Sequence, residues 1–337
     1  MKTPVTISVA FVLGMLFLGC HGSRLEPLRE AYAISVFVQN GDVYIAGNQF
    51  FGYDFQRPPS PKATLWKNGA IQFQSETTPS NADSVVVSDA DVCVAGSQSI
   101  DRHYKAALWL NGHVLYSEEM NSYDNISYRE YSLFLYGGDK YVAGGIYDGS
   151  QRGIAVIWKN GIAHHLTDGT SDAWVRSVFV SGEDVYCVGY EGSQGVFWKN
   201  GLKQKLDPNC LPTSVYVFDE IVYLAGITEG NLVALWKNND KQVLGAEPID
   251  VNYKNSVSVF VSGTDVYVLG NEGHKLGYWK NGKRHALADG SPTAGHSYPT
   301  AFANSMFVSD NNVYVVGQND DVAVLWKNDM MQTLPLN

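Results

Sequence analysis

The stretch SVFVSGTDVYVLGNEGHKLGYWKNGKRHAL, residues 258–287, contains the pattern that decides the fold. Short runs of β-branched and aromatic residues alternate in it with turn residues. The third run ends at Trp279 and leads into Asn281-Gly282. This pair is typical of a two-residue hairpin, because a type I′ turn needs positive φ at both central positions. The stretch therefore predicts four antiparallel strands joined in sequence order, and no helical periodicity competes with this interpretation.

The same pattern occurs seven times along the chain. Each copy opens with a segment that aligns without gaps, such as SVFVQNGDVYIAG from Ser35, and a Trp segment, usually WKNG, follows it. The opening residues are Ser35, Ser84, Ser132, Ser177, Ser214, Ser258 and Ser305, and the Trp residues are Trp66, Trp109, Trp158, Trp198, Trp236, Trp279 and Trp326. The six intervals between these Trp residues average about 43 residues. Four strands repeated at this period are typical of a β-propeller blade.

The sequence thus predicts an all-β, seven-bladed β-propeller with four antiparallel strands per blade and the blades in sequential order. Because the first and seventh copies both contain the pattern from its opening Ser onward, we expect the ring to close without a strand borrowed from the opposite terminus. Residues 31–337 would form this single domain.

Composition and charge exclude some classes of function. The 337 residues include 24 Lys and Arg against 34 Asp and Glu, a net charge of −10, which would repel a phosphate backbone and argues against nucleic-acid binding. No metal-binding or cofactor-binding motif is present. A single carboxylate follows the first turn in each of five repeats. One carboxylate per repeat is too few to coordinate calcium, so we interpret these residues as turn formers. We expect neither a metal nor a cofactor. These carboxylates are Asp42, Asp91, Asp139, Asp184 and Asp265.

The first 20 residues predict an export signal, with Lys2 ahead of an apolar run that is too short to be a spanning helix. The run ends in LFLGC, which resembles a bacterial lipobox, although Phe17 stands where Leu is usual. The resemblance implies lipidation of Cys20 after cleavage, with residues 21–30 as a short tether, and a lipid anchor in a bacterial membrane, most naturally the outer one. An ordinary signal peptide is the alternative, which would leave the protein secreted or periplasmic.

The other three cysteines leave an odd number and form no CxxC motif. Cys93 and Cys187 fall within strand patterns and are interpreted as small core residues. Cys210 falls in a connector, where it could be exposed.

From Ala31 to Asn337 the chain resembles the WKNG-repeat proteins of bacterial envelopes, which are similar to seven-bladed propellers and largely without an assigned function. Leu110 stands where the motif has Lys, and Asn239 and Asp329 stand where it has the turn Gly. These changes do not threaten the fold. The resemblance implies an envelope protein and supplies no catalytic residues.

The repeated residues favour structural roles over binding roles. A ring of Ser near the axis could line a channel mouth that binds an ion, but its presence in every blade favours hydrogen bonds to the neighbouring blade's backbone. The Trp residues could stack on carbohydrate, but their place within a strand favours packing between blades. A Lys follows the Trp in six repeats and could touch anionic lipid, but we interpret it as a solvated side chain covering the blade. These are Lys67, Lys159, Lys199, Lys237, Lys280 and Lys327.

Topology predicts where a partner would bind. Turns between the first and second strands, and between the third and fourth, lie at one end of every blade, whereas all connectors of variable length lie at the opposite end. Variable loops on a rigid scaffold commonly carry recognition, and aromatic residues and Arg are enriched at binding hot spots. The candidate binding residues are Phe51, Tyr53, Arg57, Arg102, Tyr104, Arg129, Tyr131, Tyr147, Trp174, Arg176 and Tyr190.

We therefore expect a non-enzymatic binding or scaffolding lipoprotein of the bacterial envelope, a monomer that recognises a protein or glycan through these loops. The first alternative is a propeller hydrolase or lyase acting on polysaccharide. It would need the loop acids Glu191, Glu229 and Glu272 to converge near the axis. The second alternative is a purely structural envelope protein, and fold alone does not choose among the three.

Overall fold

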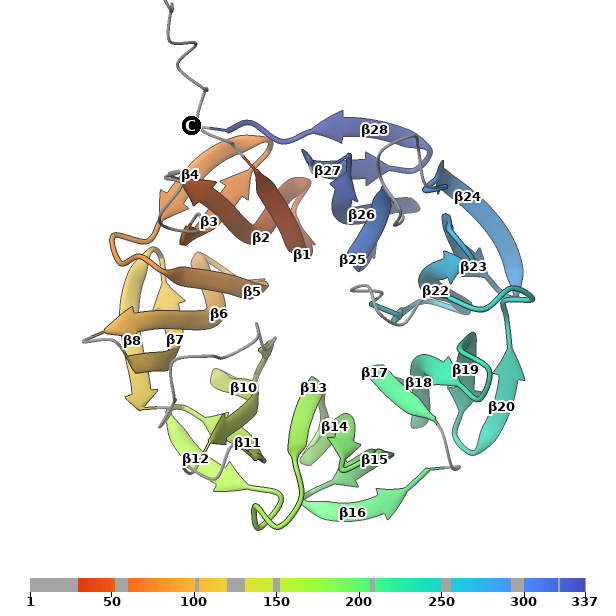
Figure 1. The fold of residues 1–337 in the computed structure, drawn as a ribbon, viewed down its shortest axis with the longest axis horizontal. Coiled ribbons are helices and arrows are strands. Elements are labelled where there is room, and N and C mark those ends of the chain that lie inside the picture. Colours follow the sequence, from red (N-terminus) through yellow and green to blue (C-terminus); the bar gives the residue numbers. More distant parts are fainter. Residues whose placement is uncertain are drawn as a thin grey trace, which may run out of the picture.

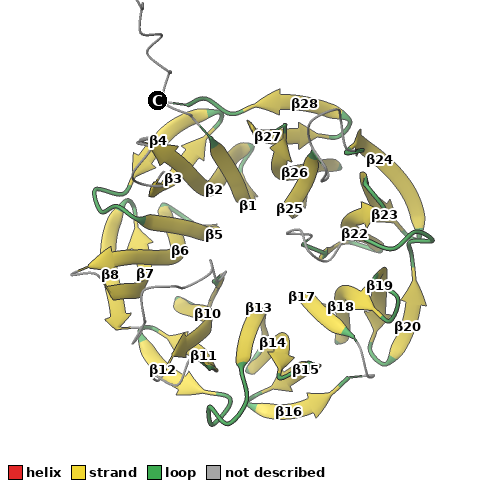
Figure 2. Ribbon diagram, in the orientation of Figure 1, coloured by secondary structure: helices red, strands yellow, loops and turns green. Residues whose placement is uncertain are grey.

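Seven four-stranded antiparallel sheets are arranged as blades around one axis (Figure 1). The computed structural model describes residues 30–51, 60–100, 103–119, 131–147, 152–206, 210–249, 256–291, 300–320 and 322–336. Every regular element in these ranges is a strand (Figure 2). The described residues contain no helix long and apolar enough to cross a membrane. The predicted all-β, seven-bladed architecture is confirmed.

Each blade consists of four consecutive strands. The first strand lies next to the axis and the fourth at the rim, and we number the strands of a blade in this order. Blade 1 contains β1 (Ala31–Gln39), β2 (Asp42–Phe51), β3 (Ser60–Lys67) and β4 (Ala70–Gln74). Blade 2 contains β5 (Ser80–Ser88), β6 (Asp91–Ile100), β7 (His103–Leu110) and β8 (His113–Glu119). Blade 3 contains β9 (Ser132–Tyr136), β10 (Asp139–Tyr147), β11 (Gly153–Lys159) and β12 (Ile162–His165).

The remaining blades follow in sequence order. Blade 4 contains β13 (Ala173–Ser181), β14 (Asp184–Glu191), β15 (Gln194–Lys199) and β16 (Leu202–Lys205). Blade 5 contains β17 (Leu211–Phe218), β18 (Ile221–Thr228), β19 (Leu232–Lys237) and β20 (Asp240–Val243). Blade 6 contains β21 (Ser258–Ser262), β22 (Asp265–Glu272), β23 (Lys275–Lys280) and β24 (Lys283–Asp289). Blade 7 contains β25 (Ala301–Ser309), β26 (Asn312–Asn319), β27 (Val322–Lys327) and β28 (Met330–Thr333).

The ring closes by packing between blades 7 and 1. Both blades have four strands of their own, and no strand passes from one to the other among the described residues. The backbone carbonyl of Pro335, just after β28, accepts hydrogen bonds from Trp66 Nε1 at 3.1 Å and from the Gln49 side chain at 3.0 Å. Apolar side chains of β1, such as Val36, share one core cluster with Val316 and Leu325 of blade 7. Closure therefore follows the prediction.

The repeated Trp fills the space between neighbouring blades, as the sequence predicted. All seven of these side chains are between 0 and 3 % exposed. Each core cluster combines two adjacent blades and contains the Trp of the later one. For example, Trp109 of blade 2 packs with Ala46 and Leu65 of blade 1. Burial of an aromatic ring at each junction is thus the main apolar contact that joins the blades.

The Asn of the WKNG motif joins the two turns of each blade. It adopts positive φ in every blade, as a type I′ turn requires. In all seven blades its Oδ1 also accepts a hydrogen bond from the backbone N–H at the start of the second strand, for example Asn68 from Val43 at 2.8 Å. This role explains why the Asn persists where the following Gly is replaced. The end of the ring that carries these turns is called the hairpin face below, and the opposite end the loop face.

The three cysteines within the described ranges are free and buried. Burial raises the pKa of Cys93 to about 11 and also raises the pKa of Cys187, so both thiols are protonated at neutral pH. Cys210 is only 2 % exposed and lies 3.7 Å from the Thr228 hydroxyl. The expectation that Cys210 could be exposed is therefore wrong, because the connector that carries it packs between blades 4 and 5.

Candidate functional site

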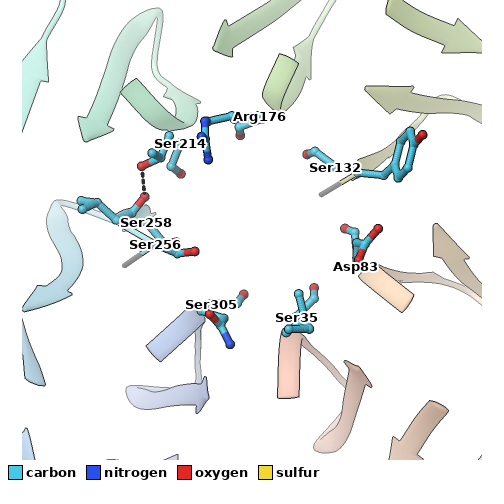
Figure 3. Close-up of a pocket in the computed structure, with 15 residues that line it drawn as sticks. Ser35, Asp83, Ser132, Arg176, Ser214, Ser256, Ser258 and Ser305 are labelled. Carbon is cyan, nitrogen blue, oxygen red and sulfur yellow. Dashed lines mark hydrogen bonds between the residues drawn. The ribbon is translucent and has the colours of Figure 1, made fainter. Parts of the chain in front are cut away.

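A cavity of about 150 Å³ lies on the axis of the ring (Figure 3). Its lining is regular: it consists of the seven repeated Ser residues, the residue before each of them, and Ser256. All of these belong to the first strand of a blade or directly precede it. The cavity is about half the lower limit for pockets that enclose drug-sized ligands, so it suits a small molecule or one end of a larger one.

The repeated Ser residues join the blades around the axis. The Oγ of each accepts a hydrogen bond from the backbone N–H of the residue after the equivalent Ser in the next blade. Six of these bonds are between 3.1 and 3.4 Å: Val85 to Ser35, Leu133 to Ser84, Val178 to Ser132, Val215 to Ser177, Val259 to Ser214, and Val36 to Ser305. The predicted structural role of the Ser ring is confirmed for these six junctions.

The residue before the Ser is turned into the cavity by a β-bulge in five blades. The pairing of first and second strands shifts register between the residues on either side of it, for example between Ala82 and Ser84. A bulge leaves one residue unpaired and re-aims its side chain. The seven residues at this position all differ: Ile34, Asp83, Tyr131, Arg176, Thr213, Val257 and Asn304. The axis thus combines a uniform Ser ring with a set of side chains specific to each blade.

A glycine in the second strand makes room for the bulge. A Cβ on Gly96 would lie 2.0 Å from the backbone oxygen of Asn81, and one on Gly189 would lie 1.9 Å from that of Trp174. Real Cβ atoms do not approach that closely. The Gly that ends the repeated DVYVAG-type segment is therefore the sequence feature that accompanies the bulge.

The charged residues of the cavity come from two blades. Asp83 enters from blade 2 and Arg176 from blade 4 (Figure 3). The Arg176 guanidinium lies 5.6 Å from the centre of the Tyr190 ring, within the range of a cation–π contact. The Tyr190 hydroxyl donates to Asp172 at 3.3 Å, which holds the ring in place. Arg176 Nε is buried and has no hydrogen-bond acceptor among the described residues.

Aromatic side chains form the layer below the Ser ring, toward the hairpin face. Side chains two residues apart point to the same side of a strand, so the residue two after each Ser also faces the axis. It is aromatic in six blades, and consecutive ring centroids from Phe134 through Phe179, Tyr216, Phe260 and Phe307 to Phe37 are 4.5–5.1 Å apart. Val86 takes this place in blade 2. Burial raises the pKa of the Tyr216 hydroxyl, so this layer is a poorly solvated floor for the cavity.

The candidate residues predicted from the sequence divide into four groups. Cys20, Tyr53, Arg57, Arg102 and Arg129 lie outside the described residues. Phe51 and Tyr147 end the second strands of blades 1 and 3 at the loop face and are half-buried. Tyr104 lies in β7 opposite Ser99, and Arg176 and Tyr190 lie in β13 and β14. The strands therefore extend further toward the loop face than the repeated pattern indicates.

Two of the predicted binding residues are core residues. Tyr131 is 2 % exposed and Trp174 is 3 % exposed, and their rings contact each other at 5.8 Å between centroids. Both pack in the cluster that joins blades 2 and 3. Their assignment to exposed loops is wrong. Trp174 departs from the repeat because it fills a space over Gly145, where a Cβ would lie 2.4 Å from its ring.

The loop acids are held at the rim of the ring. Glu191 forms an ion pair with Lys203 of β16, and Glu272 forms one at 3.1 Å with Arg284 of β24. β16 and β24 are the outermost strands of blades 4 and 6, which blade 5 separates. Glu229 is exposed in the turn after β18. These carboxylates do not meet at the axis, so they do not form the acid pair that glycoside hydrolysis needs.

The Lys residues of the hairpin face are largely neutralised within their own blades. Lys67, Lys159, Lys199 and Lys280 pair at 2.6–2.7 Å with Asp42, Asp139, Asp184 and Asp265. Hydrogen bonds from the Lys and from the motif Asn lower the pKa of each Asp. Each of these Lys side chains also lies over the repeated Tyr, for example Lys67 over Tyr44 at 5.0 Å. A basic ring aimed at anionic lipid therefore finds little support.

Sequence reasoning missed Asp83, Thr213 and Asn304 as axial residues. The available signal was the column before the repeated Ser, which varies while its neighbours repeat. In the part of the chain that the structure describes, no three His, Cys, Asp or Glu side chains gather closely enough to hold a metal ion.

Comparisons with known proteins support the fold and nothing finer. Neither protein-family models nor curated protein sequences match the chain. Among solved structures it is similar to the β-propeller domain of the Trilobed protease from Pyrococcus furiosus, described as having an open velcro topology, with 10 % identity over 91 % of this chain and 96 % of that one and a TM-score of 0.52.

Two peptidases are similar over part of their length. A puromycin-hydrolyzing peptidase from Mycobacterium tuberculosis is 11 % identical over 91 % of this chain and 54 % of its own, with a TM-score of 0.55. An acylaminoacyl peptidase from Pyrococcus horikoshii is 10 % identical over 90 % and 52 %, with a TM-score of 0.50. The chain spans about half the length of these two. At such identities the likeness shows a shared β-propeller fold alone.

Proposed function

We propose that this chain is a non-enzymatic binding protein of the bacterial envelope, which recognises a protein or glycan at its loop face with the axial cavity at the centre of the contact. One observation carries this proposal: in the five blades with a bulge, the side chains before the repeated Ser all differ and line one cavity. A purely structural propeller would have no need of five different side chains at the position where its blades are otherwise most alike.

The surrounding geometry supports the same face. The hairpin face is built from short repeated turns with most of its Lys residues paired, and offers little that is specific to one blade. At the loop face the strand ends carry Phe51 and Tyr147, and Arg176 lines the axial cavity. An aromatic and Arg-containing surface around a small cavity is a common form of recognition site.

The test is binding to an array of bacterial envelope glycans and purified envelope proteins by the folded wild type and the double variant Phe51→Ala/Arg176→Ala. If either residue is a hot spot, the variant should bind about 30-fold more weakly, a loss of about 2 kcal/mol. The matched control is Ile162→Ser/Leu202→Ser, which changes two exposed side chains beside hairpin-face turns. Weaker binding by the control and unchanged binding by the loop-face variant would place the site elsewhere. Binding to no array member would favour a structural role.

The envelope location rests on the LFLGC segment and on the resemblance to WKNG-repeat envelope proteins. In this proposal the Cys20 thiol carries a diacylglycerol group after signal cleavage, and the acyl chains hold the protein at a membrane. The variant Cys20→Ala should lose both incorporation of radioactive fatty acid and sedimentation with membranes. Equal labelling of variant and wild type would remove the lipid anchor from the account.

A further inference from the structure

The Ser hydroxyls of the ring accept hydrogen bonds from the backbone, and their own protons remain available to donate to another group. A Ser hydroxyl can accept two hydrogen bonds and donate one. Six of the seven Oγ atoms accept from a backbone N–H of the next blade. No hydrogen bond donated by any of the seven Ser hydroxyls to a protein acceptor occurs in the described ranges, and all seven line the cavity. The cavity is therefore surrounded by hydroxyl donors, an environment that suits acceptor oxygen atoms.

Arg176 adds a positive charge to these donors. Its Nε is buried without an acceptor in the described part of the chain, a state that costs free energy unless a ligand or water supplies the missing bond. The guanidinium is held by its contact with Tyr190, and Asp172 fixes that ring from one carboxylate oxygen while its other oxygen accepts from the Gly153 N–H at 2.7 Å. A guanidinium held in place in this way can bind carboxylate or phosphate through two parallel N–H groups.

The aromatic floor strengthens this site. The packed rings of the layer below the Ser ring have a lower effective dielectric constant than water, so an anion above them is attracted more strongly to Arg176 than it would be on an open surface.

Arg176 is the one cationic side chain among the cavity-lining residues, and Asp83 is the one carboxylate. The third titratable group of the lining, Tyr131, directs its hydroxyl to the backbone oxygen of Gly145. An anion in the cavity would therefore pair with Arg176.

We propose that the axial cavity binds a small organic anion, with its carboxylate or phosphate on Arg176 and the Ser hydroxyls. The ligand can be a free metabolite or the end group of a larger partner, and its size is limited by the cavity volume of about 150 Å³. This inference deepens the proposed function by assigning chemistry to the centre of its site. Small-molecule probes test it separately, since they bind or fail to bind whatever the macromolecular partner is.

Isothermal titration calorimetry with five matched probes tests the proposal: glycerate, glycerol 3-phosphate, serine, acetate and glycerol, each up to about 10 mM. At least one of the first three should bind, glycerate and glycerol 3-phosphate distinguish carboxylate from phosphate, and uncharged glycerol should not bind. Arg176→Gln should weaken the bound probe at least about tenfold. The control Arg152→Gln removes an Arg that is exposed at the loop face and donates to the Thr170 backbone oxygen, so it should leave affinity unchanged.

Arg176→Lys, which keeps the charge without the planar fork, serves if Arg176→Gln does not fold, and should also weaken binding. Absence of binding by all of the first three probes, or equal affinity in wild type and the Arg176 variants, would overturn the proposal.

Discussion

At the residue scale, the role of a side chain in this propeller depends on the space available around it as well as on its chemical type. Trp174 is an aromatic residue that breaks the repeat two positions before Arg176, and the sequence pattern therefore predicted it to be a binding residue. In the structure it packs on Tyr131 and Tyr147, with ring centroids 5.8 and 6.1 Å away, and covers Gly145 and Gly153. Its large side chain compensates for two glycines that have none.

We expect Trp174→Ala to lower the free energy of unfolding by about 3–5 kcal/mol, because it removes a buried aromatic ring and leaves a cavity between blades. Urea unfolding followed by tryptophan fluorescence or circular dichroism measures this loss. Ile162→Ala is the control, since its side chain is 67 % exposed and the change should stay within about 0.5 kcal/mol. Equal stability of the two variants would return Trp174 to the set of candidate binding residues.

The sequence could not place Trp174 because the alternation of its strand is interrupted. In a regular strand, Val175 and Ser177 would point to the same side, with Arg176 on the other. The bulge at Arg176 inserts one unpaired residue, so the inward and outward positions on either side of it no longer follow one alternation. A period-two pattern read back from Ser177 therefore fails at the residues that form the cavity and its support.

At the scale of elements, strands and turns could be predicted because each has a local cause. Asn-Gly and similar pairs need positive φ, and the structure has it at Asn68, Gly69 and their equivalents. The four-strand blade and its order follow from these turns and the short connections between them. The bulge has no such local signal in its own strand. The sequence feature that accompanies it is the Gly of the neighbouring second strand, at positions such as Gly96 and Gly189. This Gly is visible in the repeat, but the sequence alone does not show why it is needed.

Each residue of the WKN motif makes a different contact in the structure. Trp66 packs against the preceding blade, Lys67 pairs with Asp42 across the hairpin face, and Asn68 joins the two turns. Blade 2 keeps the bond from Asn111 to Asp91 although Leu110 replaces the Lys. The Lys can therefore be replaced without loss of the Asn contact, whereas the Trp and the Asn occur in all seven blades.

At the scale of the molecule, the ring separates a repeated scaffold from a variable face. Ser residues 37–49 positions apart in sequence meet at the axis, where each blade contributes a Ser and the residue before it to the cavity lining. Which side chains meet there depends on the whole ring being formed, so neither Asp83 nor Thr213 stood out in the linear pattern. The direction of variable loops toward one end could be predicted, because it follows from the number of strands per blade alone.

The central claim is that recognition belongs to the loop face, and photocrosslinking in living cells tests it most directly. A photoreactive amino acid is placed singly at Phe51 or Tyr147 at the loop face, and at Ile162 or Leu202 beside the hairpin-face turns. The account predicts a discrete adduct, from irradiated cells, at one or both loop-face positions and none at the hairpin-face positions. Adducts confined to Ile162 and Leu202, or no adduct at any of the four, would contradict it.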